Sequence, residues 1–266
     1  MATVAAWNVN SIKVRLPNLL AWTEAFQPDV LLLQEIKCQA EAFPTLELKA
    51  AGYESRAVGQ KAYNGVAVLS RHPIAVRREC LPGENADEPA RYLEVETAGL
   101  IVASIYLPNG NPAPGDKFAY KLAWMDRLIA HARDLLREEK PIVLGGDYNV
   151  IPQPRDCYDP AAWRSDALFR PESRAKLQEL AALGLTDAYR ALHPERRAYT
   201  FWDYQAGAWQ HDLGIRIDHL FLSPQAADRL IACSIDRGPR GQPKASDHTP
   251  IWCLLEDKEL QMQRAN

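Results

Sequence analysis

The stretch PIVLGGDYN, residues 141–149, joins a short apolar run to the polar side chains that follow it. Residues 141–145 have the length and composition of a buried strand. Asp147 and Asn149 come directly after that run. In layered α/β proteins, ligands bind at the rim of a sheet where strands end. The stretch therefore predicts a central strand and places polar groups where chemistry is usual.

Other short apolar runs alternate with amphipathic stretches along the whole chain. Further strands are expected at 3–7, 29–34, 65–70, 91–96, 100–106, 216–222 and 249–255. Apolar residues recur at spacings of three and four over 116–138, which predicts a helix, and further helices are expected at 172–183 and 14–26. No break in composition divides the chain. We therefore expect one α/β domain over residues 1–266, with sheets packed together and helices outside.

The overall composition indicates the cellular compartment expected for the protein but not its activity. The 266 residues are 47% hydrophobic and carry a net charge of −3, which gives no overall signal for nucleic acid. The five cysteines are scattered and show no zinc or redox spacing. The N-terminus lacks the features of a signal peptide, and no apolar run approaches the ~20 residues of a membrane span. We expect a cytoplasmic protein with reduced thiols and no membrane contact.

Polar side chains stand at the ends of most of the expected strands. They are Asn8, Glu35, Tyr106, Asp147, Asn149, Asp218 and Asp247 with His248. One such residue alone is ordinarily a cap or a turn residue, but together they indicate a site. Carboxylates supply the oxygen ligands that Mg²⁺ uses in proteins, so the set favours metal-assisted phosphate hydrolysis. The chain contains no cysteine–histidine zinc cluster and no phosphate-binding G-x-x-x-x-G-K-[ST] loop.

The tripeptide Ser246-Asp247-His248 contains the three residue types of a hydrolytic triad. Successive side chains in an extended chain point to opposite faces, so these three cannot line up as nucleophile, orienting acid and base. Ser246 is expected to turn the chain. If His248 is catalytic, its partner must come from elsewhere in the sequence.

Five segments carry a resemblance to a known family. They are WNVNS, LLLQEIK, IYLPNG, GGDYNV with RIDHLFLS, and SDHTPI, running from residue 7 to residue 251. Together they resemble the exonuclease III-type apurinic/apyrimidinic endonucleases of the endonuclease/exonuclease/phosphatase superfamily. The resemblance implies a four-layer α/β sandwich with two packed central β-sheets flanked by helices. It also implies hydrolysis of phosphodiester bonds by an attacking water.

The resemblance assigns the metal and the attacking water. Glu35 matches the main Mg²⁺ ligand, assisted by Asn10 as a weaker or water-mediated ligand, and Mn²⁺ is expected to substitute. Asp247 matches a carboxylate at or near a second metal position. Asp147 matches the residue that orients or deprotonates the water. One or two metals fit equally at this stage.

The phosphate side is assigned in the same way. Asn8 and Asn149 match amides that hold the water-activating carboxylate and the phosphate. Tyr106 and Asn109 match the phosphate-side residues of the Y-x-P-N segment. His248 matches a phosphate-oxygen ligand whose imidazole Asp218 holds. Lys37 either steadies the main metal ligand or approaches phosphate.

Two segments are candidates for DNA contact. The aromatic stretch 196–215 with its continuation resembles the wall of a pocket for an extruded abasic deoxyribose, with Phe201, Trp202 and Ile217 as the apolar lining. The alternative is that these side chains are ordinary core beneath a long loop. Lys244, in the glycine-rich GPRGQPK segment, is a candidate phosphate contact. Asn111 stands where some relatives carry arginine, so no DNA-inserting arginine is assigned there.

The resemblance predicts a Mg²⁺-dependent DNA-repair phosphodiesterase that works as a monomer. Its partners would be double-stranded DNA and abasic-site DNA. It would incise 5′ to abasic sites, degrade double-stranded DNA from 3′ to 5′ and clean 3′ ends, in proportions that the sequence leaves open. One alternative is a superfamily phosphatase or phosphodiesterase acting on inositol phosphates or phospholipids. Another is a binding protein that keeps the fold without catalysis.

Overall fold

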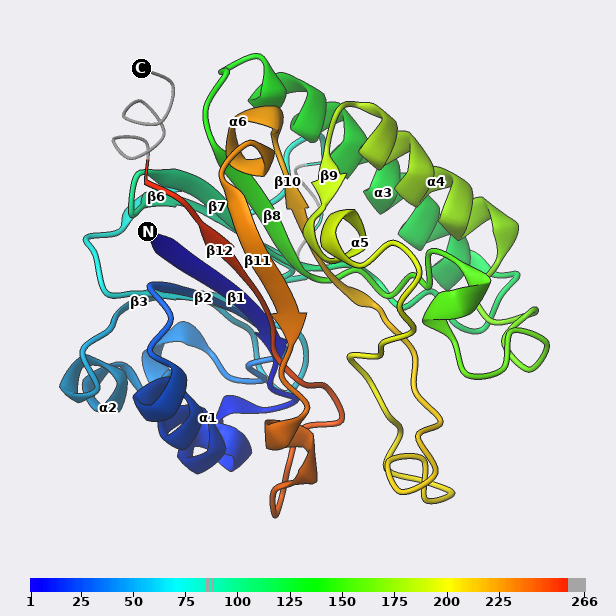
Figure 1. Cartoon of the computed structure of the whole chain (residues 1–266), viewed down its shortest axis with the longest axis horizontal. Helices are drawn as coiled ribbons and strands as arrows, with labels where there is room; N and C mark the ends of the chain where they lie inside the picture. Colours follow the sequence, from blue (N-terminus) through cyan, green and yellow to red (C-terminus); the bar gives the residue numbers. More distant parts are fainter. Residues whose placement is uncertain (85–86, 88, 258–266) are drawn as a thin grey trace.

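Two six-stranded sheets form the centre of the molecule in the computed structural model, which describes residues 1–84, 87 and 89–257 (Figure 1). The first sheet has the order β11 (Leu230–Ile235), β12 (Ile251–Leu255), β1 (Ala2–Asn8), β2 (Val30–Gln34), β4 (Val66–Ser70) and β3 (Glu54–Val58). The second has the order β5 (Ala75–Arg78), β6 (Tyr92–Thr97), β7 (Leu100–Tyr106), β8 (Ile142–Asp147), β10 (Asp218–Leu222) and β9 (Thr186–Asp187). Both sheets are mixed, because β1–β2 and β7–β8 are parallel and the other pairs are antiparallel.

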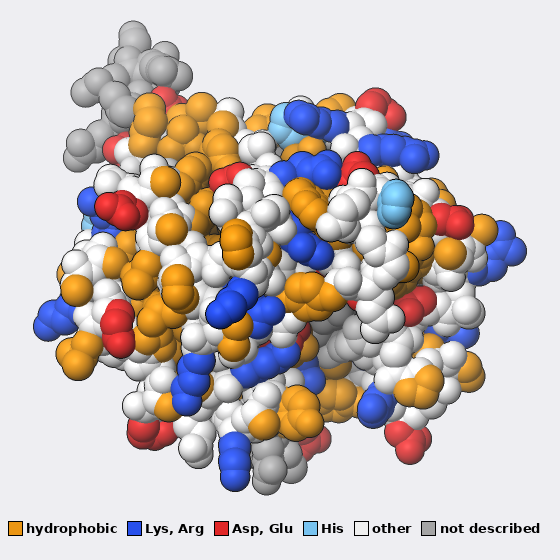
Figure 2. Space-filling model, turned by 90° about the horizontal axis from the view of Figure 1, so that it is seen from below, with side chains coloured by type: hydrophobic (Ala, Val, Ile, Leu, Met, Phe, Trp, Pro, Cys, Tyr) orange, Lys and Arg blue, Asp and Glu red, His pale blue; other side chains and the backbone are white. Residues whose placement is uncertain are grey.

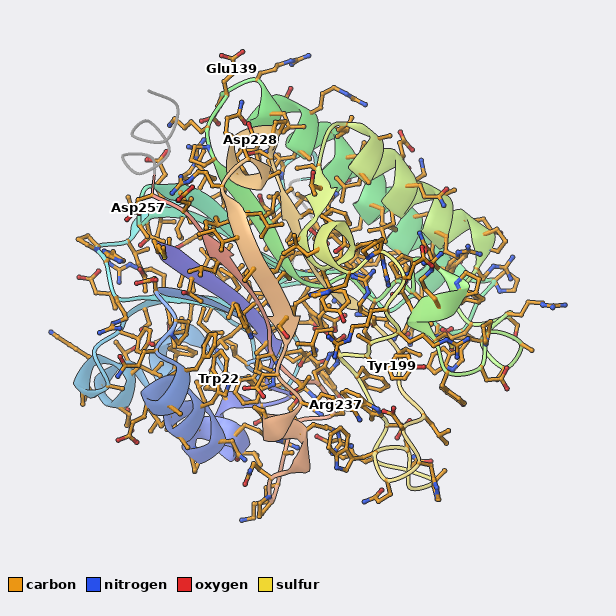
Figure 3. The ribbon with its side chains drawn as sticks, viewed as in Figure 1. Trp22, Glu139, Tyr199, Asp228, Arg237 and Asp257 are labelled. Atoms are coloured by element: carbon orange, nitrogen blue, oxygen red, sulfur yellow. The ribbon has the colours of Figure 1, made fainter. Side chains whose placement is uncertain are left out.

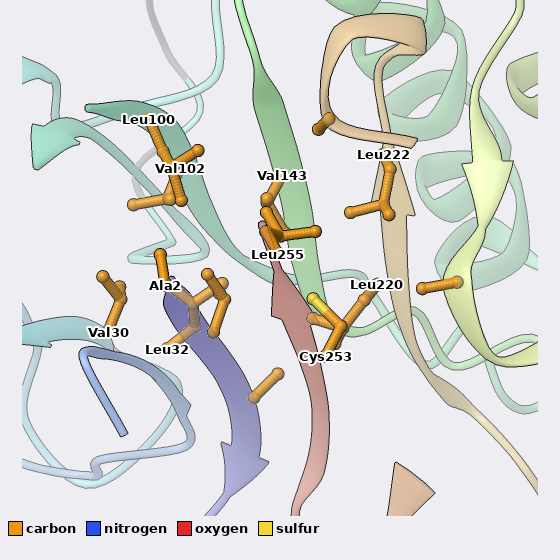
Figure 4. Packing of buried hydrophobic residues seen from close by; sticks show 14 of the residues in the cluster. Ala2, Val30, Leu32, Leu100, Val102, Val143, Leu220, Leu222, Cys253 and Leu255 are labelled. Atoms are coloured by element: carbon orange, nitrogen blue, oxygen red, sulfur yellow. The ribbon is translucent and has the colours of Figure 1, made fainter. Parts of the chain in front are cut away.

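The sheets pack face to face through one continuous apolar layer, part of which is drawn in Figure 4. Alternate residues of β2 explain how one strand serves two layers. Val30 and Leu32 enter the layer between the sheets, whereas Leu31 and Leu33 point to the outer face. A strand buried on both faces needs a continuous apolar run, which is why these strands are visible in the sequence.

Helices cover the outer face of each sheet and complete four layers. On the first sheet lie α1 (Ile12–Phe26) and α2 (Thr45–Ala50), and on the second lie α3 (Asp116–Leu136) and α4 (Pro171–Ala182) (Figure 1). Short helices α5 (Ala188–Leu192) and α6 (Pro224–Ala227) follow β9 and β10. Trp124, Met125 and Leu128 of α3 are buried against the second sheet. This arrangement confirms the expected four-layer α/β sandwich.

The eight strands and three helices expected from sequence are all present, with ends within a few residues of those expected. The other four strands are β3, β5, β9 and β11, the outermost strands of the two sheets. Within the described residues, no helix combines the length and the apolar character needed to cross a membrane.

Strand pairing brings the polar strand ends to one rim. Asn8 is paired with Gln34 at the ends of β1 and β2, so Glu35 follows beside it. Asp147 is paired with Tyr106 on one side and with Asp218 on the other. This end carries Trp22, Tyr199 and Arg237 in Figure 3, and the opposite end carries Asp228 and Asp257.

Candidate active site

The Asn8 carboxamide links the two sheets at the centre of this rim. Its Nδ2 donates to Glu35 Oε1 at 2.8 Å and to Asp147 Oδ2 at 2.9 Å. Its Oδ1 accepts from the backbone N–H of Asn10 at 3.0 Å. Asn8 is fully buried, so these bonds fix the spacing of the two carboxylates. The amide thus joins the residue after β2 to the last residue of β8.

Hydrogen bonds fix the Asp147 side chain, and its surroundings raise its pKa. Its Oδ1 accepts from the backbone N–H of Asn149 at 2.9 Å, and only 1% of the residue is exposed. Burial, together with the negative charges of Asp218 and Glu35, raises the pKa of Asp147 to about 7, although the charge of His248 acts in the opposite direction. A carboxylate of this acidity is suited to accept a proton near neutral pH.

His248 is paired with Asp218, as expected from sequence. Its Nδ1 lies 2.8 Å from Asp218 Oδ2, and its Nε2 lies 3.8 Å from Asp147 Oδ2. Burial alone would lower the pKa of His248, but the charges of Asp218 and Asp147 raise it to about 10. The side chain is therefore an imidazolium at neutral pH, a hydrogen-bond donor suited to an anionic oxygen.

Ser246 plays no nucleophilic part. Its hydroxyl is fully buried and donates to the backbone oxygen of Asn8 at 2.7 Å, and it accepts from the backbone N–H of His248 at 3.2 Å. Ser246 Oγ also lies 3.3 Å from Asp247 Oδ1, but the His248 imidazole pairs with Asp218, so the three side chains do not form a triad.

Glu35 belongs to a group of side chains that could hold a hard cation. Oxygen or nitrogen atoms of Glu35, Asp147 and His248 lie within 4.8 Å of one another. His248 is paired with Asp218, and Glu35 is the more exposed of the two carboxylates, at 18% of its side chain against 2% for Asp147, so Glu35 is the residue that would hold Mg²⁺. Burial alone would raise the pKa of Glu35, but hydrogen bonds from Asn8 and Lys37 and the charges of Lys37 and His248 lower it, so Glu35 is ionised.

Asn10 and Asp247 lie beside Glu35 and contact each other. Asn10 Nδ2 donates to Asp247 Oδ1 at 3.0 Å, and the Asn10 side-chain oxygen accepts from Lys37 Nζ. Lys37 Nζ also lies 2.8 Å from Glu35 Oε2. Lys37 therefore forms an ion pair with the residue expected to hold the metal. Asn10 is linked to Glu35 through Lys37, which contacts both side chains.

Asn149 and Asn109 line the other side of the site. Asn109 Nδ2 donates to Asn149 Oδ1 at 3.2 Å, and Asn149 Nδ2 donates to the backbone oxygen of Leu107 at 2.9 Å. Burial and the charges of Glu35 and Asp147 raise the pKa of Tyr106 well above its usual value, so its hydroxyl keeps its proton. The site therefore combines protonated and amide donors with carboxylates.

A cavity of about 270 Å³ opens at this cluster. It is lined by Glu35, Tyr106, Asn109, Asn111, Asp147, Asn149, Trp163, Asp166, Leu168, Phe201, Asp203, Ile217, Asp247 and His248. Phe201 and Ile217 form part of its apolar wall, and the Phe201 ring centroid lies 5.0 Å from that of His248.

Trp202 lies elsewhere, which corrects its expected place in the pocket wall. It is fully buried in a separate cluster with Tyr199 and Ala208, and its Nε1 donates to Asp212 Oδ1 at 3.0 Å. Its backbone N–H pairs with the Asp247 oxygen, so the chain is extended here and neighbouring side chains point to opposite sides. Phe201 faces the cavity, and the next residue faces the core.

Lys244 is exposed but does not line the cavity. It borders a separate groove between α1 and the segment around Gly238–Gly241. Conversely, Trp163, Asp166 and Asp203 line the cavity although sequence reasoning did not select them. The first two lie in the long segment between β8 and α4, and a loop of this length favours function without indicating which residues serve it.

The end of the molecule that holds the strand ends is the face seen in Figure 2. Lys and Arg side chains gather across the middle of this face. The net charge of −3 is therefore unevenly distributed. Local clustering of basic side chains is what attracts a polyanion, whatever the overall charge.

Comparison with known proteins agrees with this geometry. The model of the Endonuclease/Exonuclease/phosphatase family matches residues 5–248. The chain is 34% identical over 263 residues to exodeoxyribonuclease III of Haemophilus influenzae, covering 93% of this chain and 97% of that protein.

Solved structures give the same picture. An AP endonuclease from Archaeoglobus fulgidus superposes with a TM-score of 0.93 at 34% identity, covering 97% of this chain and 100% of that one. The 3′ phosphatase NExo from Neisseria, bound to a product DNA hairpin, superposes with a TM-score of 0.94 at 36% identity, with the same coverage.

Proposed function

Because this chain belongs to the endonuclease/exonuclease/phosphatase family and is a nuclease of DNA repair, we propose that it cleaves the phosphodiester bond 5′ to an abasic site with Mg²⁺ as its metal. The observation that carries the proposal is the convergence of Asp147, Glu35 and the His248–Asp218 pair on one cavity with an apolar wall. An abasic sugar has no base to stack or pair, so it enters such a cavity at lower cost than a complete nucleotide.

Each side chain has a distinct part in the reaction. Asp147, fixed by Asn8 and Asn149, orients a water molecule and takes its proton. The His248 imidazolium donates to a phosphate oxygen and stabilises the charge that develops there. Glu35, with Asn10 and Asp247 nearby, would hold Mg²⁺, which supplies neutralisation of phosphate charge. Mn²⁺, another cation that accepts oxygen ligands, is expected to substitute.

The same site accounts for the related activities that we propose. A frayed 3′ end presents its terminal phosphodiester or phosphate to the same donors as an internal abasic site, so 3′→5′ degradation and 3′-end cleaning need no second centre. The chain is proposed to act as a monomer, since all the groups named above come from one chain. Phe201 and Ile217 favour a sugar over the highly charged ring of an inositol phosphate, which is the second candidate substrate.

The test is a duplex with one tetrahydrofuran abasic analogue, incubated with Mg²⁺ and, in parallel, with chelator. We expect incision 5′ to the analogue that leaves a 3′-hydroxyl, loss of cleavage with chelator, and recovery with excess Mg²⁺ or Mn²⁺. An intact duplex, an inositol polyphosphate and a phospholipid vesicle are the comparison substrates. Faster turnover of either of the last two than incision of the abasic duplex would overturn the proposal.

A further inference from the structure

Lys121 is a fully buried lysine in the second turn of α3. Within residues 1–84, 87 and 89–257, no salt bridge involves it. Burying an ammonium group without a carboxylate partner is costly, and lysine is among the residues least often found fully buried. The position therefore requires a reason beyond packing.

The Lys121 side chain donates hydrogen bonds to two backbone carbonyls. Its Nζ donates to the Asn109 oxygen at 3.0 Å and to the Asn149 oxygen at 2.6 Å. These carbonyls belong to the segments that follow β7 and β8, the two parallel strands that deliver Tyr106 and Asp147 to the site. Both the ammonium and the neutral amine carry the two N–H groups that these two oxygens need.

The neighbouring backbone leaves room for the lysine stem. Gly110 has a φ of +89°, and a Cβ atom built there would lie 2.6 Å from Lys121 Cδ and 3.2 Å from its Cβ. The loop between Asn109 and α3 thus passes directly over the aliphatic part of the side chain. The stem is packed and the head is hydrogen-bonded, so Lys121 has one available position.

We propose that Lys121 is a positioning residue for the phosphodiester hydrolysis, one that ties the Asn109 and Asn149 segments together from behind. Asn149 in turn contacts Asp147 through its backbone N–H and Asn109 through its side chain, so a shift of the Asn149 backbone moves groups on both the water side and the phosphate side. Lys121 itself lines no part of the cavity. This inference rests on the nuclease function proposed above.

The test compares Lys121→Met with wild type on the abasic duplex under single-turnover conditions, at a temperature well below the melting point of each protein. Methionine keeps most of the stem and removes both donors. We expect the cleavage rate constant to fall about 100-fold, the effect of a small displacement of reacting groups, while the Kd for DNA measured in chelator stays within about threefold. Lys121→Gln, which keeps an N–H donor on a shorter arm, is expected to recover part of the rate.

Ile129→Val is the matched control, because it shortens a buried side chain of the same helix away from both carbonyls. It is expected to lower the melting temperature and to leave the rate constant within about threefold of wild type. A Lys121→Met rate within that range, or a DNA affinity that falls in proportion to the rate, overturns the inference. If Lys121→Met does not fold, Lys121→Leu, which also removes both donors, decides by the same criterion. Failure of wild type to cut the duplex would instead count against the proposed function.

Discussion

Replacing Asp147 with asparagine is expected to lower kcat on an abasic duplex at least about 10³-fold, the upper part of the range for loss of a general base. The variant keeps the shape of the side chain and one acceptor oxygen, so DNA binding should change little. The measurement is single-turnover cleavage together with the Kd in chelator. Asp134→Asn, at an exposed residue of α3, is the control and should cleave like wild type. A variant that keeps more than about one tenth of the wild-type rate would remove Asp147 from its assigned part.

Stability provides an independent check on the same variant. The pKa of Asp147 in the folded protein is about 7, above the ordinary 3.8, because the buried carboxylate is disfavoured. Its ionisation therefore destabilises the fold as pH rises from about 4 to about 7. Asparagine cannot ionise, so in chelator at pH 8 the variant should melt no lower than wild type. The difference in melting temperature should shrink as the pH is lowered toward 5.

Asp218→Asn is expected to lower the cleavage rate by up to about 30-fold at pH 8 and by less than about twofold at pH 6. In wild type, the charge of Asp218 and that of Asp147 hold the pKa of His248 at about 10, so the imidazolium persists through neutral pH. Without the Asp218 charge, the pKa of His248 falls toward the ordinary 6.5, and the imidazolium is lost as pH rises through that value.

The pH profile separates this explanation from a general loss of structure. Single-turnover rates of wild type and Asp218→Asn are compared from pH 5.5 to 9. If the ratio of the two rates is the same at every pH, the explanation through the His248 pKa is contradicted. The second comparison is made in a His248→Gln background. If Asp218 acts through the imidazole, adding Asp218→Asn there should cost little more, because the two residues act as one unit.

The interior of the fold was predictable because its strands are buried on both faces. All eight expected strands are interior to their sheets, and most of them, such as β2 and β4, are buried on both faces and therefore read as continuous hydrophobic runs. The four strands that were not expected are the edges, and β5 shows the reason. It is largely exposed, so its sequence AVRR carries no apolar run.

The site was predictable wherever a side chain leaves the end of a buried strand. Asp147, Glu35 and His248 belong to this class, and the structure brings them together. Trp163 and Asp166 do not, because their place in the cavity depends on how the 151–170 loop folds. Trp202 shows a different difficulty. Adjacent side chains of an extended segment point to opposite sides. Of the adjacent aromatics Phe201 and Trp202, Phe201 is therefore the one that faces the cavity.

Lys121 could not have been selected from sequence for yet another reason. It stands on the amphipathic helix 116–138, where a lysine is ordinarily a solvated residue of the polar face. Only the three-dimensional contacts with the Asn109 and Asn149 carbonyls distinguish it.

The central claim is that a water molecule assisted by Asp147 attacks phosphorus at the bond 5′ to the abasic site. Cleavage of a duplex that carries a natural abasic deoxyribose in ¹⁸O-labelled water, followed by mass spectrometry of both fragments, tests it most directly. We expect one ¹⁸O in the new 5′-phosphate and an unlabelled 3′-hydroxyl on the other fragment. Label in the 3′-hydroxyl, or a 3′ unsaturated aldehyde left by elimination, would contradict it.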